Sequence, residues 1–164
     1  MIYGFLYVPP NCNSGQTGST AVPAQGRLQL LIVGGYATNP NELPYQVSIQ
    51  YYGMHTCGGT IYSESYIITA AHCVDGDPVF AFTVIAGEHS LSKNDDTEQR
   101  RQVSKKIVHE AYVGSLYGND IAVLKLDKPL ELNSAVQKLS VSPPGHRAKG
   151  KLAVVTTLAM RLAI

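Results

Sequence analysis

The chain has 164 residues, of which 45% are hydrophobic and 15% are charged, and this length favours one domain of ordinary size with tails. Thirteen Lys and Arg residues stand against twelve Asp and Glu, so the net charge of +1 gives no electrostatic reason to expect nucleic acid or an anionic membrane as a partner. No apolar run approaches the roughly 20 residues that a membrane-spanning helix needs.

The first 31 residues are predicted to be a weak apolar start followed by a flexible segment. The opening run MIYGFLYV has no basic residue before it and ends at Pro9 and Pro10, which makes it a poor signal peptide. Residues 9–26 are small, polar and rich in Pro and Gly, as flexible segments are. The folded part is therefore expected to begin near Leu30.

Short apolar segments recur from there, separated by stretches rich in Gly, Pro, Asn and Asp. The segments cover residues 45–52, 58–63, 66–71, 79–87, 103–109, 120–126 and 151–156. Their length and alternation are typical of β-strands, and no long amphipathic helix lies between them. Six or seven short strands predict an all-β, antiparallel barrel or sandwich.

The chain has three cysteines, Cys12, Cys57 and Cys73, so at least one is unpaired if the other two are bridged. Cys57 and Cys73 are the natural pair. Their bridge would close a loop of about 16 residues, for which the chain-entropy model gives about 3 kcal/mol of stabilisation. A disulfide indicates an oxidising compartment. Cys12 lies among small polar residues and is interpreted as an idle thiol, with a tether to another chain as the alternative.

His72 lies in the segment TAAHC, and alone such a histidine is more often a structural residue than a functional one. Three more segments accompany it along the chain: IVGG (32–35), CGGT (57–60) and NDIAVLKL (119–126). Together and in this order, the four segments resemble the N-terminal half of the chymotrypsin and trypsin family of serine endopeptidases over about residues 32–156. The resemblance implies an antiparallel Greek-key barrel, the first of two in a trypsin-like fold, acting on a protein or peptide substrate.

By this resemblance His72 matches the family's general base and Asp120 the carboxylate that orients it. A free imidazole titrates near pH 6.5, so it can take a proton from a hydroxyl at neutral pH and return it later to a leaving amine. An aspartate on the other ring nitrogen holds the required tautomer and stabilises the imidazolium. The alternative interpretations are core packing for His72 and a turn or cap for Asp120.

A zinc site formed by His55, Cys57, His72 and Cys73 is a weaker alternative. The spacings His-x-Cys and His-Cys differ from the usual Cys-x-x-Cys pattern, and adjacent residues such as His72 and Cys73 rarely converge on one tetrahedral ion.

A second site is suggested by residues 87–99, which resemble the calcium-binding loop of trypsins. Carboxylates would come from Glu88, Asp95 and Glu98, and backbone carbonyls from Ser90 and Lys93. Calcium requires six to eight oxygen ligands, which a flexible acidic loop can supply. A solvated acidic loop without an ion is the equal alternative, and no cofactor is expected for the reaction itself.

The sequence also departs from the family pattern. It contains no Gly-Asp-Ser-Gly-Gly segment, which carries the nucleophilic serine in the family's second barrel, and Leu31 precedes Ile32 where trypsin-like zymogens usually carry a basic residue. We therefore interpret residues 1–31 as a pro-segment and residues 32–164 as a first barrel truncated before the second.

The expected function is that of a secreted trypsin- or chymotrypsin-like serine endopeptidase, inactive as this isolated chain because it lacks the serine. The alternative is a non-catalytic homologue that binds or regulates. A barrel without its twin is also expected to expose apolar surface and strand edges, and therefore to be only marginally stable.

Overall fold

The computed structural model describes residues 38–91, 94–114 and 118–141. Several predictions from the sequence concern residues outside these ranges: the leading segment 1–31, the IVGG motif at 32–35, Cys12, Lys93 and the strand at 151–156. The domain boundary between residues 31 and 32 therefore stays a prediction.

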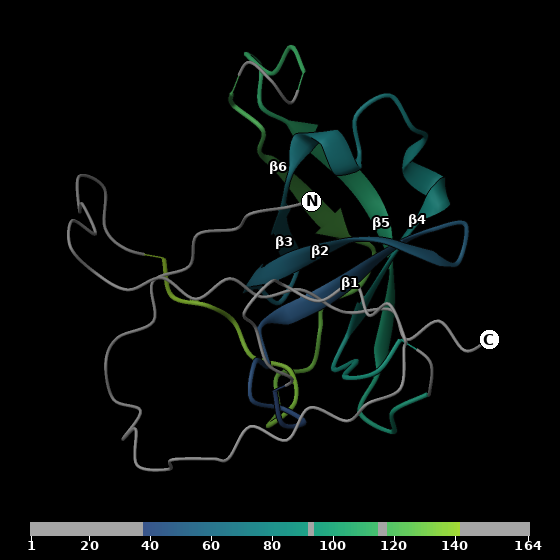
Figure 1. Ribbon diagram of the computed structural model, residues 1–164, viewed down its shortest axis with the longest axis vertical. Helices are drawn as coiled ribbons and strands as arrows, with labels where there is room; N and C mark the ends of the chain where they lie inside the picture. Colours follow the sequence, from purple (N-terminus) through teal and green to yellow (C-terminus); the bar gives the residue numbers. More distant parts are fainter. Residues whose placement is uncertain (1–37, 92–93, 115–117, 142–164) are drawn as a thin grey trace, which may run out of the picture.

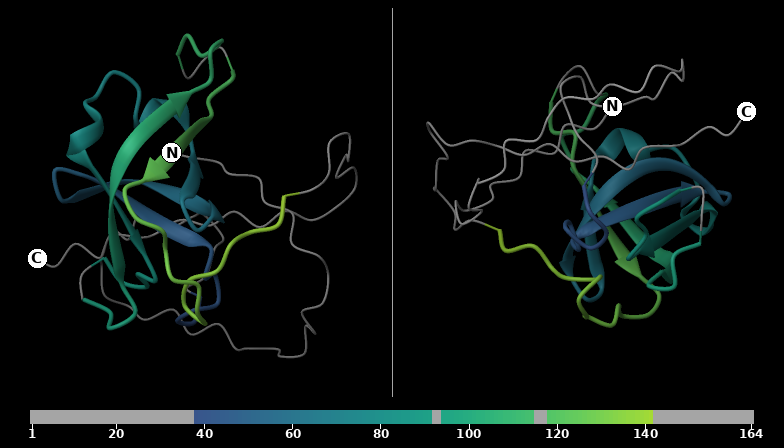
Figure 2. Two further views of the ribbon diagram at one scale, coloured as in Figure 1. Left: turned by 180° about the vertical axis from the view of Figure 1, so that it is seen from behind. Right: turned by 60° about the horizontal axis from the view of Figure 1, so that its bottom comes forward.

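Six antiparallel strands form a closed barrel in the order β1-β2-β3-β6-β5-β4 (Figures 1 and 2). The strands are β1 (Gln46–Tyr51), β2 (Met54–Ser63), β3 (Tyr66–Thr69), β4 (Phe82–Ala86), β5 (Gln99–Val108) and β6 (Ala122–Leu126). Two 3-10 helices, η1 (Ala71–Cys73) and η2 (Val79–Ala81), lie between β3 and β4. The prediction of an all-β antiparallel barrel is confirmed. Within the described residues, no helix has the length and apolar character needed to cross a membrane.

The core of the barrel consists mainly of β-branched side chains, together with Phe82 and Leu124. The largest fully buried hydrophobic side chains are Phe82, Ile49, Ile61, Ile67, Ile85, Leu124, Val47, Val74, Val84 and Val136. Such residues favour strands because their bulk at Cβ packs well on a pleated surface. Gly59 on β2 permits close packing here, since a Cβ at this position would lie 2.8 Å from Ile67 Cγ2 and 3.1 Å from Val47 Cγ2.

Four predicted strands have different bounds in the structure, and two of them, β2 at Met54 and β5 at Gln99, begin four residues before the predicted start. The segment 66–71 is a strand only to Thr69, and η1 then turns the chain at Ala71. The segment 79–87 begins as η2, and its strand starts at Phe82. Pro78 precedes η2 with φ of −72°, which suits the entry to a helical turn. These turns carry the chain out of the barrel wall between β3 and β4.

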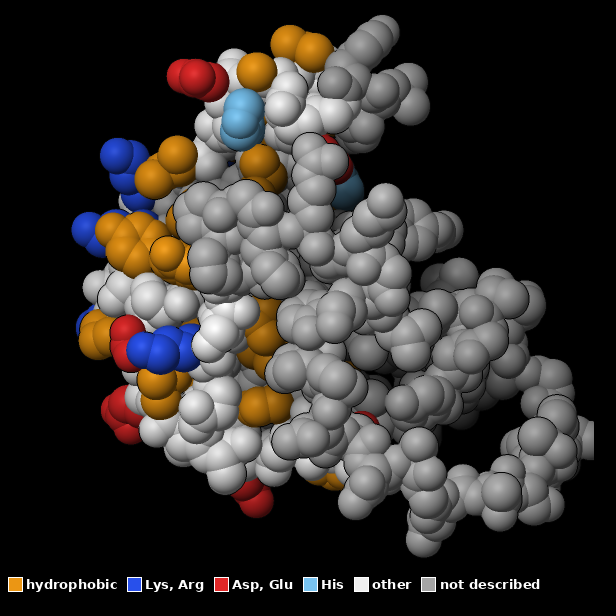
Figure 3. Space-filling model, turned by 90° about the vertical axis from the view of Figure 1, so that its left-hand side faces the viewer, with side chains coloured by type: hydrophobic (Ala, Val, Ile, Leu, Met, Phe, Trp, Pro, Cys, Tyr) orange, Lys and Arg blue, Asp and Glu red, His pale blue; other side chains and the backbone are white. Residues whose placement is uncertain are grey.

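The surface of the barrel carries several exposed apolar side chains. Eight large ones are between 44% and 73% exposed: Tyr52, Met54, Tyr62, Phe80, Ile107, Val113, Ile121 and Val141. Figure 3 shows hydrophobic side chains interspersed with Lys and Arg along one margin of the molecule. Each of the six strands nevertheless pairs with two neighbours, so the expectation of exposed strand edges is wrong for these strands. Marginal stability stays a prediction that now rests on the apolar surface alone.

Candidate active site

Pairing between β3 and β6 brings His72 close to Asp120 although 48 positions separate them. Thr69 at the end of β3 lies opposite Ala122 at the start of β6. The chain turns into η1 immediately after β3, and Asp120 stands two residues before Ala122. The two residues thus project from neighbouring strand ends at the same margin of the barrel.

His72 and Asp120 are joined by two hydrogen bonds. The backbone N–H of His72 donates to Asp120 Oδ1 at 2.8 Å, and the ring nitrogen Nδ1 lies 2.7 Å from Asp120 Oδ2. Because the carboxylate accepts, Nδ1 carries the proton in this pair, and the lone pair of a neutral ring is then on Nε2. Both side chains are 27% exposed, so the pair lies at the surface rather than in the core.

The pKa of Asp120 is held below its ordinary value of 3.8. Burial of the carboxyl by itself raises the pKa. This effect is outweighed by groups that lower the pKa: hydrogen bonds from the ring and the backbone N–H of His72, the charge of His72, and a backbone hydrogen bond from Ala71. Asp120 therefore stays ionised over the whole physiological range, as a carboxylate that orients an imidazole must.

We expect Asp120→Asn to weaken the acid dependence of stability. A folded-state pKa below the unfolded one means that Asp120 stabilises the fold above pH 3.8 and loses this contribution as pH falls through the folded value. The difference in urea midpoint between wild type and Asp120→Asn should therefore be largest near pH 6 and shrink towards about pH 2. The exposed Asp75→Asn serves as the matched control. A difference that is constant with pH would show that the pair does not perturb Asp120.

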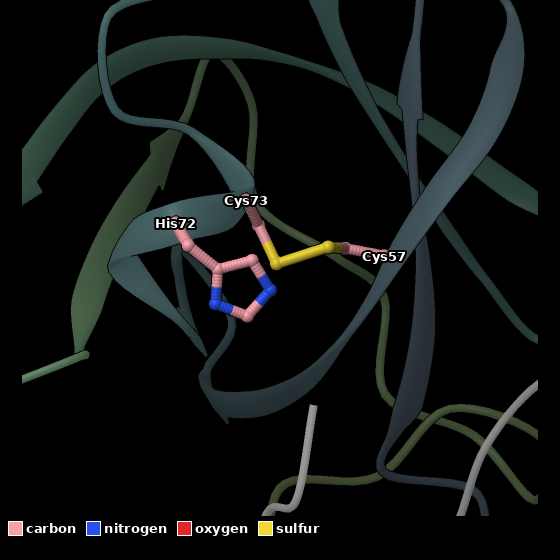
Figure 4. Close-up of side chains that lie close together, drawn as sticks. All are labelled: Cys57, His72 and Cys73. Carbon is pink, nitrogen blue, oxygen red and sulfur yellow. A yellow bond between two sulfur atoms is a disulfide. The ribbon is translucent and has the colours of Figure 1, made fainter. Parts of the chain in front are cut away.

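A disulfide between Cys57 and Cys73 links β2 to η1, with Cα atoms 6.1 Å apart. The predicted pairing is confirmed. Figure 4 shows the ring of His72 beside this disulfide, with one ring nitrogen towards the sulfurs. The bridge therefore restrains the turn that carries His72.

Side chains from β1 and β5 hold the segment that follows η1. Lys106 Nζ donates to the carbonyls of Val74 and Asp77, each at 2.6 Å, and the Tyr51 hydroxyl donates to Asp77 Oδ1 at 3.1 Å. Sequence reasoning missed these contacts because lysine and tyrosine in strands resemble ordinary surface residues, and no local signal reveals a partner about 30 positions away. These hydrogen bonds stabilise the residues directly after η1, and the disulfide stabilises η1 itself.

A second histidine, His55 on β2, is paired with Ser48 on β1. Ser48 Oγ and His55 Nδ1 are 2.8 Å apart, and Ser48 is fully buried. Burial lowers the pKa of His55, which therefore favours the neutral ring. His55 is thus engaged with Ser48 and is not among the residues that gather around His72.

The predicted calcium loop has a defined local structure in its described part. Asp95 Oδ2 accepts the backbone N–H groups of His89 at 2.7 Å and Ser90 at 2.9 Å, and Glu98 Oε1 accepts the N–H of Asp95 at 2.9 Å. Lys93 lies outside the described residues. Among those described, the ligand atoms of Glu88, Asp95 and Glu98 do not converge within 4.8 Å as a set of three.

Glu88 is the member of this loop whose surroundings fit a cation. Its Oε2 is buried and has no hydrogen-bond partner within the described part of the chain. The pKa of Glu88 is raised, mainly by burial and further by the charges of Glu98 and Asp95, although a hydrogen bond with Ser48 and the charge of Arg100 lower it in part. A cation beside Glu88 would relieve both the burial cost and the repulsion between these carboxylates.

The closed β-barrel and the histidine–aspartate pair both agree with what the sequence motifs led us to expect. A family model described as Trypsin matches residues 32–157. The chain therefore belongs to the trypsin family of serine proteases, and the resemblance found in the sequence is confirmed.

Three curated proteins illustrate the relationship. Chymotrypsin-like elastase family member 1 from Bos taurus is 45% identical over 118 residues, covering 68% of this chain and 43% of that protein. Coagulation factor IX from Cavia porcellus is 43% identical over 113 residues (68% and 39%), and Trypsin-1 from Astacus astacus is 41% identical over 130 residues (75% and 55%). The chain thus spans between 39% and 55% of the length of these relatives.

Proposed function

We propose that His72 is the general base, and Asp120 its orienting carboxylate, of a trypsin-like serine endopeptidase. The observation that carries the proposal is the pair of hydrogen bonds from the backbone and ring of His72 to the two oxygens of one carboxylate. Membership of the trypsin family supports a protein or peptide as the substrate. Secretion is part of the same proposal and is supported by the Cys57–Cys73 disulfide.

In this reaction Nε2 of His72 takes the proton of a serine hydroxyl while that oxygen attacks the peptide carbonyl. The imidazolium that forms keeps its Nδ1–H on Asp120, whose charge stabilises it. Nε2 then gives the proton to the leaving amine, which completes acylation of the serine. The lowered pKa of Asp120 supports this division of roles, because a carboxylate that stays ionised does not compete for the proton.

The 164 residues contain no Gly-Asp-Ser-Gly-Gly segment, the segment in which the nucleophilic serine of the family is expected. We propose that an active form obtains this serine from a second barrel, and that the 164-residue polypeptide alone does not hydrolyse peptides. The alternative function is a non-catalytic homologue that keeps the barrel as a binding or regulatory module.

Active-site labelling distinguishes these possibilities. A fluorophosphonate, which reacts with an activated serine, should not label the 164-residue chain. It should label a chimera in which residues 32–156, beginning at a free Ile32 amine, are followed by the C-terminal part of Astacus astacus Trypsin-1, and the chimera should cleave peptide substrates. Labelling of the chain alone would overturn the claim of inactivity, and a folded but unreactive chimera would favour the binding module.

We also propose that the loop at residues 87–99 binds calcium, with Glu88 and Glu98 as carboxylate ligands, Asp95 as the third predicted carboxylate, and the carbonyls of Ser90 and Lys93 as further donors. The buried, unpartnered Oε2 of Glu88 supports this assignment. Bound calcium would hold the loop through its charge and would take no part in proton transfer at His72.

Calcium at a hundredfold excess over its Kd should raise the Tm by at least about 5 °C. Glu88→Gln should abolish this rise, because the amide removes one negative charge from the ligand set. The variant should be no less stable than wild type without calcium, since burial makes the carboxylate costly there. The exposed Glu110→Gln is the control, and an equal calcium response in Glu88→Gln would refute the assignment.

A further inference from the structure

We propose that Cys57, Cys73 and His72 form a zinc site when their disulfide is reduced. The ligand atoms of these three residues lie within 4.8 Å of one another (Figure 4). No other group of three histidine, cysteine or acidic ligands is gathered as closely in the described part of the chain. The spacing along the sequence argued against convergence of adjacent residues, but η1 and the strand β2 bring the three side chains together.

Once the disulfide is open, the three ligand atoms can surround a tetrahedral ion. Zinc holds thiolates at about 2.3 Å and imidazole nitrogen at about 2.0 Å, so its ligand atoms are roughly 3.5 Å apart. Cys57 and Cys73 have Cα atoms 6.1 Å apart, a separation that lets their sulfurs reach this spacing by rotation about the Cα–Cβ bonds. Two cysteines and one histidine fill three positions and leave the fourth for water.

The histidine is already held as zinc-binding histidines usually are. Such residues donate their second ring N–H to a carboxylate, which fixes the tautomer and directs the free nitrogen at the metal. His72 Nδ1 is 2.7 Å from Asp120 Oδ2, so Nε2 is the nitrogen available to a metal. The 27% exposure of the His72 side chain gives an ion access to the site from solvent.

The change is a reduction followed by metal binding. A dithiol reductant transfers two electrons and two protons to the Cys57–Cys73 disulfide, which becomes two thiols while the dithiol becomes a disulfide. Zinc then displaces the two thiol protons and accepts the lone pair of His72 Nε2. Under the proposed function, the general base loses the lone pair that takes the serine proton, so reduction with zinc would switch the site off.

The test uses the full 164-residue chain with and without reduction, and cobalt(II) as a spectroscopic substitute for zinc. The reduced chain should bind one cobalt with thiolate charge-transfer absorption and should lose it to zinc, while the oxidised chain should show no such absorption. Zinc should also raise the Tm of the reduced chain, because binding to ordered ligands stabilises the folded state. If reduction alone unfolds the chain, zinc should restore cooperative unfolding.

Variants separate this site from adventitious binding. His72→Asn and Cys73→Ser should each weaken zinc binding at least about tenfold, and Asp120→Asn by about 10- to 100-fold. The exposed His89→Ala should bind as wild type does. Equal zinc affinity in His72→Asn and wild type, or the absence of any zinc effect on the unfolding of the reduced chain, overturns the proposal. These readouts need no proteolysis, so they succeed or fail independently of the proposed function.

Discussion

Replacing His72 by alanine in the active chimera is expected to lower kcat for peptide hydrolysis by about 10⁴- to 10⁶-fold. Alanine cannot take the serine proton, and the members of a catalytic triad act as a unit. Steady-state hydrolysis of a chromogenic peptide measures the loss, with KM expected to change little because His72 is proposed to act in proton transfer.

Asp120→Asn should lower kcat of the same chimera by about 10⁴-fold, a loss typical of a serine protease triad that lacks its aspartate. An asparagine can present its N–H to the imidazole and so favours the tautomer in which Nε2, rather than Nδ1, carries the proton. The exposed His109→Ala is the control for loss of a histidine near the loop before Asp120. A kcat within tenfold of wild type in either His72→Ala or Asp120→Asn would contradict the assigned roles.

Gly87→Ala is expected to destabilise the barrel by about 3 kcal/mol or more. Gly87 has φ of +74°, and a Cβ there would lie 2.3 Å from the carbonyl oxygen of Thr97. A backbone atom cannot move aside as a flexible side chain can. The Thr97 hydroxyl donates to the Gly87 carbonyl at 2.7 Å, so the clash also strains the closure of the acidic loop. Urea unfolding of the chimera at pH 7 measures the change.

Gly53→Ala separates the steric clash from the backbone penalty. Gly53 has φ of +83° in the turn between β1 and β2, but nothing lies within 4 Å of a Cβ placed there. It should therefore cost only about 1 kcal/mol, the price of a left-handed conformation for alanine. Equal losses for the two variants would show that the contact with Thr97 does not limit position 87.

Local alternation in the sequence predicted an antiparallel barrel or sandwich, and the resemblance of the motifs to the trypsin family implied the barrel and the meeting of His72 with Asp120. Alternating apolar residues located the strands, and the motifs around His72 and Asp120 implied a fold that joins them. Their separation of 2.7 Å between Nδ1 and Oδ2 agrees with that implication. Glu88 was singled out for its charge, whereas its buried and unpartnered oxygen emerged only from the fold.

Other features could not be predicted because they arise from packing between distant segments. Strand β1 is buried on both faces, with Ser48 fully buried and Gln50 only 6% exposed, although their polar side chains suggested a solvent-facing side. Arg100 on β5 donates to Gln50 Oε1 on β1 at 3.3 Å, although 50 positions separate the two residues. Periodicity along one strand carries no information about what covers it.

The proposed reaction requires that the His72 ring carries a proton on Nδ1, bonded to Asp120, and that Nε2 is free to accept a proton. Histidine-selective ¹⁵N NMR of the chimera at about pH 8.5, where a free imidazole is neutral, measures this directly. We predict that His72 shows a protonated Nδ1 and an unprotonated Nε2, and that Asp120→Asn reverses or mixes the tautomers. A neutral wild-type His72 that carries its proton on Nε2 would contradict the proposed role of His72 as the general base.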